Sequence, residues 1–230
     1  MALRRPRAVA RTRALRRSFS RILDRLEAQH PNAWTELHFT NPYELLVATI
    51  LSAQCTDARV NLVTPSLFQR FPSPAGLARA TAEALEPMIQ AAGFFRMKAR
   101  SLIGMANAVV TEHGGQIPRD MDALVKLPGV GRKTANVVLG HAFGVPAFPV
   151  DRHVLRVAYR LGLTDSLNPE VVETELGAGL PASRWTRASD TLILHGRRVC
   201  NPKPHCDRCQ VRAMCRYFEN LGPAVRRKLG

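Results

Sequence analysis

Apolar residues recur at helical spacing along most of the chain, and no convincing pair of alternating, strand-like segments is present. Residues 20–29 carry apolar side chains three and four positions apart, which is the spacing of one helix face. The segment from Pro42 to Gln54 is apolar on nearly every side, which predicts a central, buried helix. We therefore predict an all-α protein of about ten short helices, without a repeat of fixed period.

Local signals place the ends of several helices. An Asn, Ser or Thr followed by Pro, or soon afterwards by Glu, predicts a helix start; such starts occur at Asn41, Ser73, Thr81 and Asn168. A long helix that begins near Arg96 should end at Gly114. Further helices are expected over 119–126, 131–144, 151–162 and 185–199.

Composition limits the kinds of protein this chain can be and the kinds of partner it can bind. The 230 residues are 46% hydrophobic, which is enough for a packed core and excludes a wholly disordered chain. No run of apolar residues is long enough to suggest a membrane span. The formal charge is +15, from 33 Lys and Arg against 18 Asp and Glu. This excess predicts a polyanionic partner, nucleic acid first.

The positive charge is concentrated at the two ends of the chain. Residues 1–17 contain seven Arg and no acid, and residues 196–230 contain nine basic and two acidic residues. Each end therefore carries +7, which leaves +1 for the middle, so the middle must recognise its ligand by shape and specific groups. We predict that residues 1–17 form a basic disordered arm. An Arg-rich start is also typical of an organelle transit peptide, and this alternative stays open.

Four cysteines lie close together near the C-terminus, at positions 200, 206, 209 and 215. This spacing allows Cys200, Cys206, Cys209 and Cys215 to surround one metal centre. Disulfides are disfavoured because a basic chain of this type is expected inside the cell. Zinc and a [4Fe–4S] cluster both accept four thiolates, and the spacing alone does not separate them. The fifth thiol, Cys55, is expected to be a small buried residue.

The segment from Leu127 to Ala135 (LPGVGRKTA) joins two predicted helices. Gly129 and Gly131 allow a tight turn and a close approach of the backbone to a partner. The next helix begins directly afterwards, so its unpaired N–H groups could bind a phosphate. This arrangement favours a helix-hairpin-helix contact with a DNA backbone, although an ordinary turn between helices would show the same glycines.

Two ionisable residues near this segment suggest chemistry. Lys133 falls in the first turn of a helix, where the positive end of the macrodipole disfavours its ammonium form, as a nucleophilic amine requires. Asp151 precedes another helix and could be merely its N-cap. A carboxylate beside a lysine could instead stabilise a sugar cation and move protons. By contrast, the residue pattern alone gives no role to Gln54, expected to be a helix-end amide bonded to nearby backbone, or to Phe94, expected among aromatic core residues.

Together these features resemble the endonuclease III family of DNA glycosylase/AP lyases, the iron–sulfur type of the helix-hairpin-helix superfamily. The resemblance spans about residues 20–217 and is carried by LSAQCTD (51–57), LPGVGRKTANVVLG (127–140), VDRHVLRV (150–157), LILHGRRVC (192–200) and the four cysteines. It implies two helical domains with a DNA cleft between them. Residues 35–145 would form a six-helix domain with the hairpin at about 121–140. Residues 18–34 and 146–230 would form a discontinuous domain with the cluster loop at 200–215.

The resemblance also implies roles for individual residues. Lys133 would be the nucleophile and Asp151 the catalytic carboxylate. Gln54 would fill the space left by a flipped base, and Phe94 stands where the family has a second, usually aliphatic, wedge. The hairpin residues that would hold phosphate are Gly129, Val130 and Gly131, and the ligands of a [4Fe–4S] cluster would be Cys200, Cys206, Cys209 and Cys215.

The implied activity is removal of oxidised pyrimidines, such as thymine glycol, from double-stranded DNA, followed by cleavage 3′ to the abasic site. One active site per chain suggests a monomer, and the location would be the cytoplasm (nucleoid) if the protein is bacterial, with organelle targeting left open. One departure concerns the loop between Cys200 and Cys206, which has five residues where the family usually has six. Lys203 in this loop would contact DNA, although the changed length puts the loop's shape in question.

Two other interpretations remain. Adenine–DNA glycosylases share the hairpin, the Asp and the cluster, but they lack a Lys at the position of Lys133 and carry a further C-terminal domain. This chain extends 15 residues beyond Cys215, which we take as evidence against that relationship. The other possibility is a non-catalytic DNA-binding module with a four-cysteine zinc site.

Overall fold

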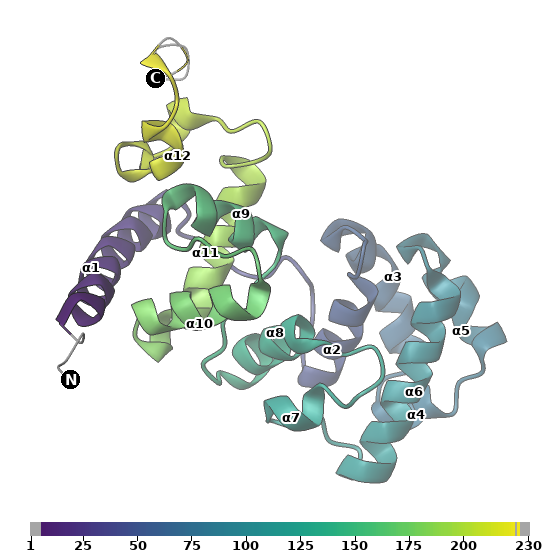
Figure 1. Cartoon of the computed structure of the whole chain (residues 1–230). Helices are drawn as coiled ribbons and strands as arrows, with labels where there is room; N and C mark the ends of the chain where they lie inside the picture. Colours follow the sequence, from purple (N-terminus) through teal and green to yellow (C-terminus); the bar gives the residue numbers. More distant parts are fainter. Residues whose placement is uncertain (1–5, 224, 226–230) are drawn as a thin grey trace. The chain divides into compact units, whose positions relative to one another are not determined.

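The computed structural model describes residues 6–223 and 225, and it divides into two helical units (Figure 1). We call residues 35–147 the hairpin unit, and residues 1–34 together with 148–230 the cysteine unit. Within the described residues the regular structure is entirely helical, as the sequence pattern predicted. In the same residues, no helix is long and apolar enough to cross a membrane.

The hairpin unit is built from consecutive helices and one 3₁₀ turn: α2 (Pro42–Leu51), α3 (Asp57–Arg70), α4 (Pro74–Ala78), α5 (Ala82–Ile89), η1 (Gln90–Ala92), α6 (Phe95–His113), α7 (Met121–Leu124) and α8 (Arg132–Phe143). The predicted starts at Asn41, Ser73 and Thr81 are confirmed, because each side chain accepts a hydrogen bond from a backbone N–H in the first turn. The predicted end of α6 at Gly114 is also confirmed, with Gly114 at φ 58°.

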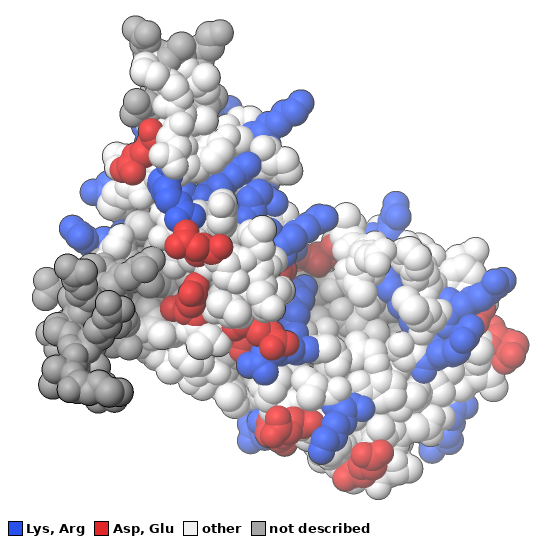
Figure 2. Space-filling view, viewed as in Figure 1, with Lys and Arg blue, Asp and Glu red and all other residues white. Residues whose placement is uncertain are grey.

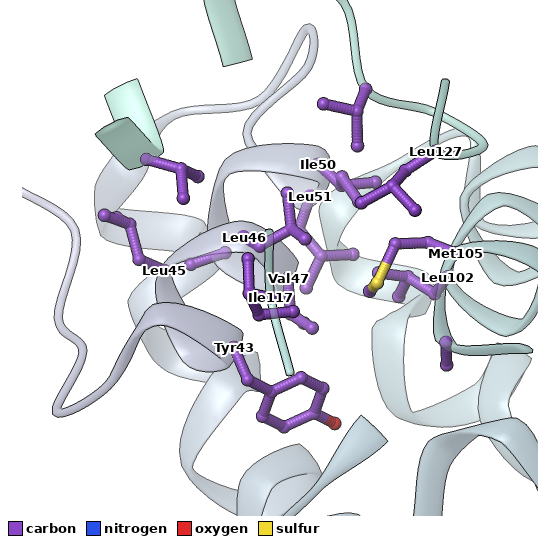
Figure 3. Close-up of a cluster of buried hydrophobic side chains, with 14 of the residues drawn as sticks. Tyr43, Leu45, Leu46, Val47, Ile50, Leu51, Leu102, Met105, Ile117 and Leu127 are labelled. Carbon is purple, nitrogen blue, oxygen red and sulfur yellow. The ribbon is translucent and has the colours of Figure 1, made fainter. Parts of the chain in front are cut away.

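Helix α2 is the centre of the hairpin unit. Its residues Leu45, Leu46 and Leu51 are fully buried (Figure 3), as the apolar pattern predicted. The helix ends at Leu51, however, and not at Gln54, because Gln54 adopts a left-handed conformation with φ 53°. Such a residue cannot continue a right-handed helix. The sequence pattern therefore predicted the helix correctly but placed its C-terminal end three residues too far along the chain.

The pattern did not indicate helix α3. Thr56 caps this helix through its side-chain oxygen, and Pro65 lies inside it. Proline normally interrupts a helix because it removes a backbone donor, and the apolar pattern predicted no helix over these residues. Packing supports it: Val60 and Leu67 are fully buried in the core of the hairpin unit.

The cysteine unit combines the first helix with the last third of the chain: α1 (Pro6–Gln29), α9 (Arg152–Leu161), α10 (Pro169–Gly179), η2 (Ala182–Arg184), α11 (Trp185–Arg198), η3 (Cys206–Arg208), η4 (Arg212–Met214) and α12 (Arg216–Glu219). The division from the hairpin unit falls at Ala147, whereas the sequence placed it at residue 145. Phe148 explains the difference, because it is buried in the core of the cysteine unit.

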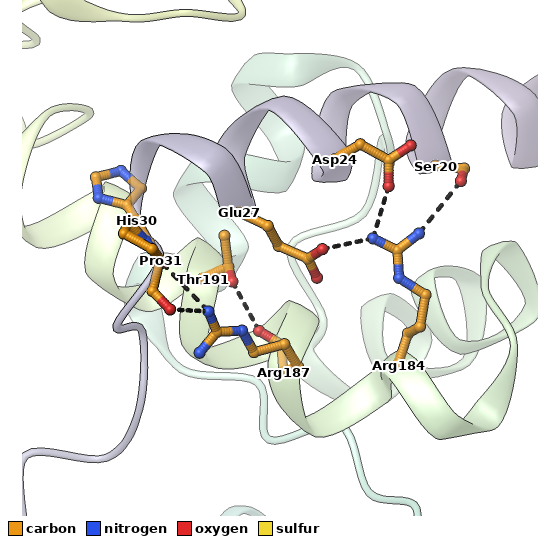
Figure 4. A network of polar contacts seen from close by, with 8 residues as sticks. All are labelled: Ser20, Asp24, Glu27, His30, Pro31, Arg184, Arg187 and Thr191. Atoms are coloured by element: carbon orange, nitrogen blue, oxygen red, sulfur yellow. Dashed lines mark hydrogen bonds and ion pairs between the residues drawn. The ribbon is translucent and has the colours of Figure 1, made fainter.

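Polar contacts tie α1 and the residues that follow it to η2 and α11, although these segments are far apart in the sequence (Figure 4). Arg184 lies 2.7 Å from both Asp24 and Glu27 and also donates a hydrogen bond to Ser20. Arg187 donates to the backbone carbonyl of Pro31. These contacts lie beside an apolar interface, in which Phe19, Ile22, Leu23 and Leu26 of α1 are buried.

The length of α1 corrects the prediction of a disordered arm. The helix begins at Pro6, so residues 6–17 are helical, while residues 1–5 lie outside the described residues. Ala, Arg and Leu make up most of the segment 6–17, and these residues favour helix. A helix already anchored at residues 19–26 can be extended at little cost, because propagation is easier than nucleation.

Candidate functional site

The turn from Leu127 to Gly131 is fixed from inside the hairpin unit. The backbone N–H of Val130 donates to the carbonyl of Leu127 at 3.0 Å, and the Val130 side chain is buried in the core. Gly129 has φ 79°, a conformation that other residues adopt only with strain. The turn therefore needs one glycine, at position 129, and one apolar anchor.

These contacts correct the role given to Val130. Its N–H is used within the turn and its side chain faces the core, so it holds the hairpin in shape and does not present a group to phosphate. The N–H groups of Gly129 and Gly131, in contrast, make no hydrogen bond within the described part of the chain. Gly131 is the N-cap of α8, with φ −94° and no side-chain cap. The turn thus offers unpaired donors at a helix N-terminus, which is a site for an anion.

Lys133 is the second residue of α8, and its side chain is exposed. The helix behind it is firmly held, because Ala135, Val138 and Leu139 on its other face are buried. The amine therefore extends from a rigid support beside the unpaired N–H groups of the turn. A nucleophile on a regular element is held more closely than one on a loop.

Asp151 lies in the cysteine unit and is the N-cap of α9. Its Oδ1 atom accepts hydrogen bonds from the backbone N–H groups of His153 at 2.7 Å and Val154 at 2.9 Å. The capping role considered from the sequence is thus real. Within the described residues Oδ2 makes no hydrogen bond, and the side chain is half-buried. One carboxylate oxygen fixes the group and the other remains available to a ligand.

Gln54 and Phe94 share an unusual backbone conformation. Among the described residues they are the two non-glycine positions with positive φ, at 53° and 50°. Both side chains are exposed, and that of Phe94 is 59% exposed. This corrects two expectations, because Phe94 does not join the core and the Gln54 amide makes no hydrogen bond to the described residues. Strained residues with exposed side chains are typical of binding sites.

Four cysteines surround one pocket in the cysteine unit. Cys200, Cys206, Cys209 and Cys215 all line it, together with His195 and apolar side chains, and it is partly open to solvent. Burial raises the pKa of the Cys209 thiol to about 11 and also raises the pKa values of Cys206 and Cys215. Thiolates there need a positive partner, so this donor set fits an iron–sulfur or zinc centre.

The thiols are not grouped as ligands of a single ion. In the part of the chain that the structure describes, no three His, Cys, Asp or Glu side chains are arranged to hold one metal ion. A zinc ion holds each thiolate sulfur at about 2.3 Å, which brings the four sulfurs close together. The four cysteines instead share one pocket, which is the arrangement expected of ligands to a common centre.

The fifth thiol lies elsewhere. Cys55 is half-buried in the turn after α2 and is not the fully buried residue that the sequence suggested. The backbone N–H of Cys55 donates to the carbonyl of Ser52, which closes the turn that carries Gln54. Cys55 therefore lies in a turn, and not in α2, because α2 ends at Leu51.

Comparison with known proteins identifies the family. The HhH-GPD superfamily of base excision DNA repair proteins matches residues 47–182. Endonuclease III of Synechocystis is 47% identical over 84% of this chain and 90% of its own. The chain belongs to the endonuclease III family. It is a DNA N-glycosylase/AP lyase of base excision repair, with the helix-hairpin-helix fold of that family.

Solved structures agree with this assignment. A non-covalent endonuclease III–DNA complex superposes with a TM-score of 0.84 at 41% identity, covering 89% of this chain and 96% of that one. A trapped endonuclease III–DNA covalent intermediate, in an estranged-adenine complex, gives the same score and identity, with coverage of 89% and 97%. The similarity thus extends through both units.

In this family member two arginines of α9 hold the loop between the first two cysteines. Arg156 donates to the carbonyl of Cys200 at 2.9 Å and to that of Gly196 at 2.8 Å. Arg160 donates to the carbonyls of Asn201 and Pro202 and lies 3.5 Å from the Cys200 sulfur. The five-residue loop is therefore supported by charged side chains from a neighbouring helix, and Lys203 is exposed on it.

No sequence pattern indicated the buried histidine pair that lies beside the cysteines. His30 Nε2 lies 3.0 Å from His195 Nδ1, and His195 Nε2 lies 3.7 Å from the sulfur of Cys209. Burial, followed by the charge of His30, lowers the pKa of His195 to about 4, and burial also lowers the pKa of His30. Both rings are therefore neutral at pH 7. Only folding brings these residues together, because His30 and His195 are 165 positions apart.

The surface of the cysteine unit is basic around α9. Figure 2 shows Lys and Arg side chains gathered over the part of this unit that holds α9 and the cysteine loop. Arg152 and Arg197 contribute to the positive charge around His153. A surface of this kind attracts the phosphate backbone of DNA.

Proposed function

We propose that this enzyme removes oxidised pyrimidines, of which thymine glycol is the type, from duplex DNA and then cuts the strand on the 3′ side of the abasic site. The observation that carries the proposal is the place of Lys133: an exposed amine in the first turn of α8, directly after a turn with unpaired N–H donors. The trapped covalent intermediate of a 41% identical endonuclease III supports a covalent route.

The reaction begins when the neutral amine of Lys133 attacks C1′ of the damaged nucleotide. The C1′–N bond breaks, its electron pair leaves with the base, and the base takes up a proton. Ring opening gives a Schiff base between Lys133 and the sugar. This cation acidifies the C2′ hydrogen, and loss of that proton expels the 3′ phosphate by β-elimination. Water then releases the sugar fragment from the amine.

Asp151 supports this chemistry as a carboxylate that is already fixed. Because Oδ1 accepts two backbone hydrogen bonds, the carboxylate of Asp151 is fixed in one orientation. Its second oxygen can stabilise the positive sugar and transfer protons. Lys133 belongs to the hairpin unit and Asp151 to the cysteine unit.

DNA binding uses separate groups for backbone and base. The N–H groups of Gly129 and Gly131 bind a phosphate, and Lys203 with the arginines around α9 adds charge. Gln54 and Phe94 enter the duplex when the damaged nucleotide leaves the stack. Their exposure and their fixed backbone conformation support this role. The enzyme acts as a monomer, with one set of these residues per chain.

The four cysteines hold a [4Fe–4S] cluster in this proposal. When bound, the cluster supplies iron–thiolate bonds that fix the loop of residues 200–215. The pocket that the four cysteines share supports a common centre, and membership of the endonuclease III family, which is generally of the [4Fe–4S] type, supports the cluster. The residues of this chain supply the rest of the support, through Arg156, Arg160 and the histidine pair.

Borohydride trapping tests the mechanism. The enzyme is mixed with a duplex that contains one thymine glycol, and sodium borohydride is added during turnover. We expect a covalent enzyme–DNA adduct with the parent protein and none with Lys133→Gln. Lys126→Gln is the matched control, because Lys126 is exposed on the same hairpin and should still form the adduct. An equal yield of adduct from Lys133→Gln would show that the nucleophile is another residue.

A further inference from the structure

Lys98 is a buried lysine whose side chain bonds two separate backbone segments. It is 3% exposed, and its Nζ donates to the carbonyl of Leu51 at 2.7 Å and to the carbonyl of Ala92 at 2.9 Å. Lysine is almost never fully buried unless its charge is paired or bonded. Nothing in the proposed reaction uses this amine, so its burial needs another explanation.

The two carbonyls belong to the turns that carry Gln54 and Phe94. Leu51 is the last residue of α2, three positions before Gln54. Ala92 is the last residue of η1, two positions before Phe94. Both carbonyls stand at helix ends, where the helix itself provides no donor. One ammonium group therefore joins the ends of two elements that lie 41 residues apart in the sequence.

The conformation of the two turns makes this link significant. Gln54 and Phe94 are the non-glycine residues with positive φ among those described, and such conformations are strained. Strained residues persist only where surrounding contacts hold them. The backbone of Lys98 also ties the first turn of α6 to the second of these turns, since its N–H donates to the carbonyl of Phe94 at 3.0 Å.

We propose that Lys98 is a positioning residue that clamps these two turns together, so that Gln54 and Phe94 are presented to DNA as a rigid pair. This inference rests on the proposed function, because it deepens the role given there to the two side chains. A rigid pair enters the duplex without a further loss of conformational freedom, which is the general advantage of preorganisation. Lys98 itself does not touch the substrate.

The chemistry of lysine suits the position. Its ammonium group has three donors on a flexible stem, so it can reach two carbonyls that point from different elements. Burial lowers the pKa of Lys98, and the nearby Cys55 opposes this shift. Replacement by methionine keeps the apolar stem but leaves both carbonyls without their donor.

The test compares two substrates. The first is a duplex with one thymine glycol, from which excision requires the nucleotide to leave the stack. The second is single-stranded DNA with an abasic site, which needs no flipping. We expect Lys98→Met to lower the single-turnover rate of excision from the duplex by about tenfold or more. Borohydride trapping on the single strand should stay within about twofold of the parent enzyme.

Tyr43→Phe is a matched control for loss of stability. Tyr43 is also buried in the hairpin unit, and its hydroxyl donates to the carbonyl of Phe71 at 2.8 Å. This substitution removes a buried hydrogen bond from the other end of α2 and leaves both turns intact. If Tyr43→Phe lowers duplex excision as much as Lys98→Met does, the effect reflects stability and the inference is wrong.

A double-mutant cycle gives a readout that a purely structural role would not change. In a Gln54→Ala/Phe94→Ala background, the further substitution Lys98→Met should change duplex excision by less than about twofold, because the clamped side chains are already gone. An unchanged tenfold effect in that background would overturn the inference. Failure of the proposed function looks different, since the parent enzyme itself would then neither excise thymine glycol nor form the borohydride adduct.

Discussion

Gly129 lies directly against Ser101 of α6. A Cβ atom added at residue 129 would be 2.7 Å from the Cβ atom of Ser101, closer than two such atoms approach in proteins. The backbone of Gly129 also has φ 79°. The hairpin turn is therefore held against α6 by a contact that only glycine allows.

Gly129→Ala should destabilise the protein by about 1–3 kcal/mol, from both the contact with Ser101 and the strained φ. Gly131→Ala is the matched variant, because a Cβ there meets nothing within 4 Å and φ is −94°. We expect Gly131→Ala to melt like the parent protein but to bind DNA more weakly, since its methyl group lies beside an N–H that would hold phosphate. Thermal unfolding and fluorescence anisotropy measure the two effects. Equal melting temperatures for both variants would contradict this account of the turn.

Asp151→Asn should separate the two functions of this side chain. Asparagine is as good an N-cap as aspartate, so its oxygen can accept the bonds from His153 and Val154 and stability should change by less than about 1 kcal/mol. The lost charge should lower single-turnover excision by about 10²–10⁴-fold, the usual range for a general acid or base. Asp151→Ala, as a comparison, should lose both the cap and the activity. Full activity of Asp151→Asn would assign the proton transfers to another group.

The purified protein should be yellow-brown and contain about four irons per chain. Metal analysis that found one zinc and no iron would instead support a structural zinc site. Removal of the iron should expose the loop of residues 200–215 to protease, because its sulfurs lose their common partner. The cut sites can be located by mass spectrometry. Residues 35–147, which have their own core, should remain resistant in the same sample.

His153 should make stability depend on pH. Burial lowers its pKa, Asp151 opposes this shift, and Arg156, Arg197 and Arg152 lower the pKa further. The folded pKa is thus below the unfolded value of about 6.5, so the unfolded state binds more protons as the pH falls below that value. The folded protein should therefore lose stability on acidification through this range.

His153→Gln should flatten part of this dependence. Arg156 lies 3.1 Å from Nδ1 of His153, a contact that a protonated ring cannot accept. We expect the difference in unfolding free energy between pH 7 and pH 5 to be smaller in the variant, as measured by urea denaturation. The other histidines remain in both proteins, so the difference isolates His153. Parallel pH profiles for the two proteins would contradict the assignment.

The sequence by itself determined the helical class and many helix starts. Asn41, Ser73, Thr81 and Asn168 each cap the helix that follows them, because a cap depends on residues only two or three positions away. It also indicated the turn at Gly129, since the need for positive φ is a property of the local backbone. The residues of the family motifs could be named for the same reason: they are short and contiguous.

Tertiary structure alone decided which of these residues face the core and which face a ligand. Val130 was expected to face phosphate and is buried, while Phe94, which the local pattern placed in the core and the family resemblance placed at the DNA, is exposed. The link from Lys98 to Leu51 joins residues 47 positions apart, and the contact between His30 and His195 joins residues 165 apart. No local sequence pattern predicts these contacts, because the two residues of each pair come together only after the helices have packed.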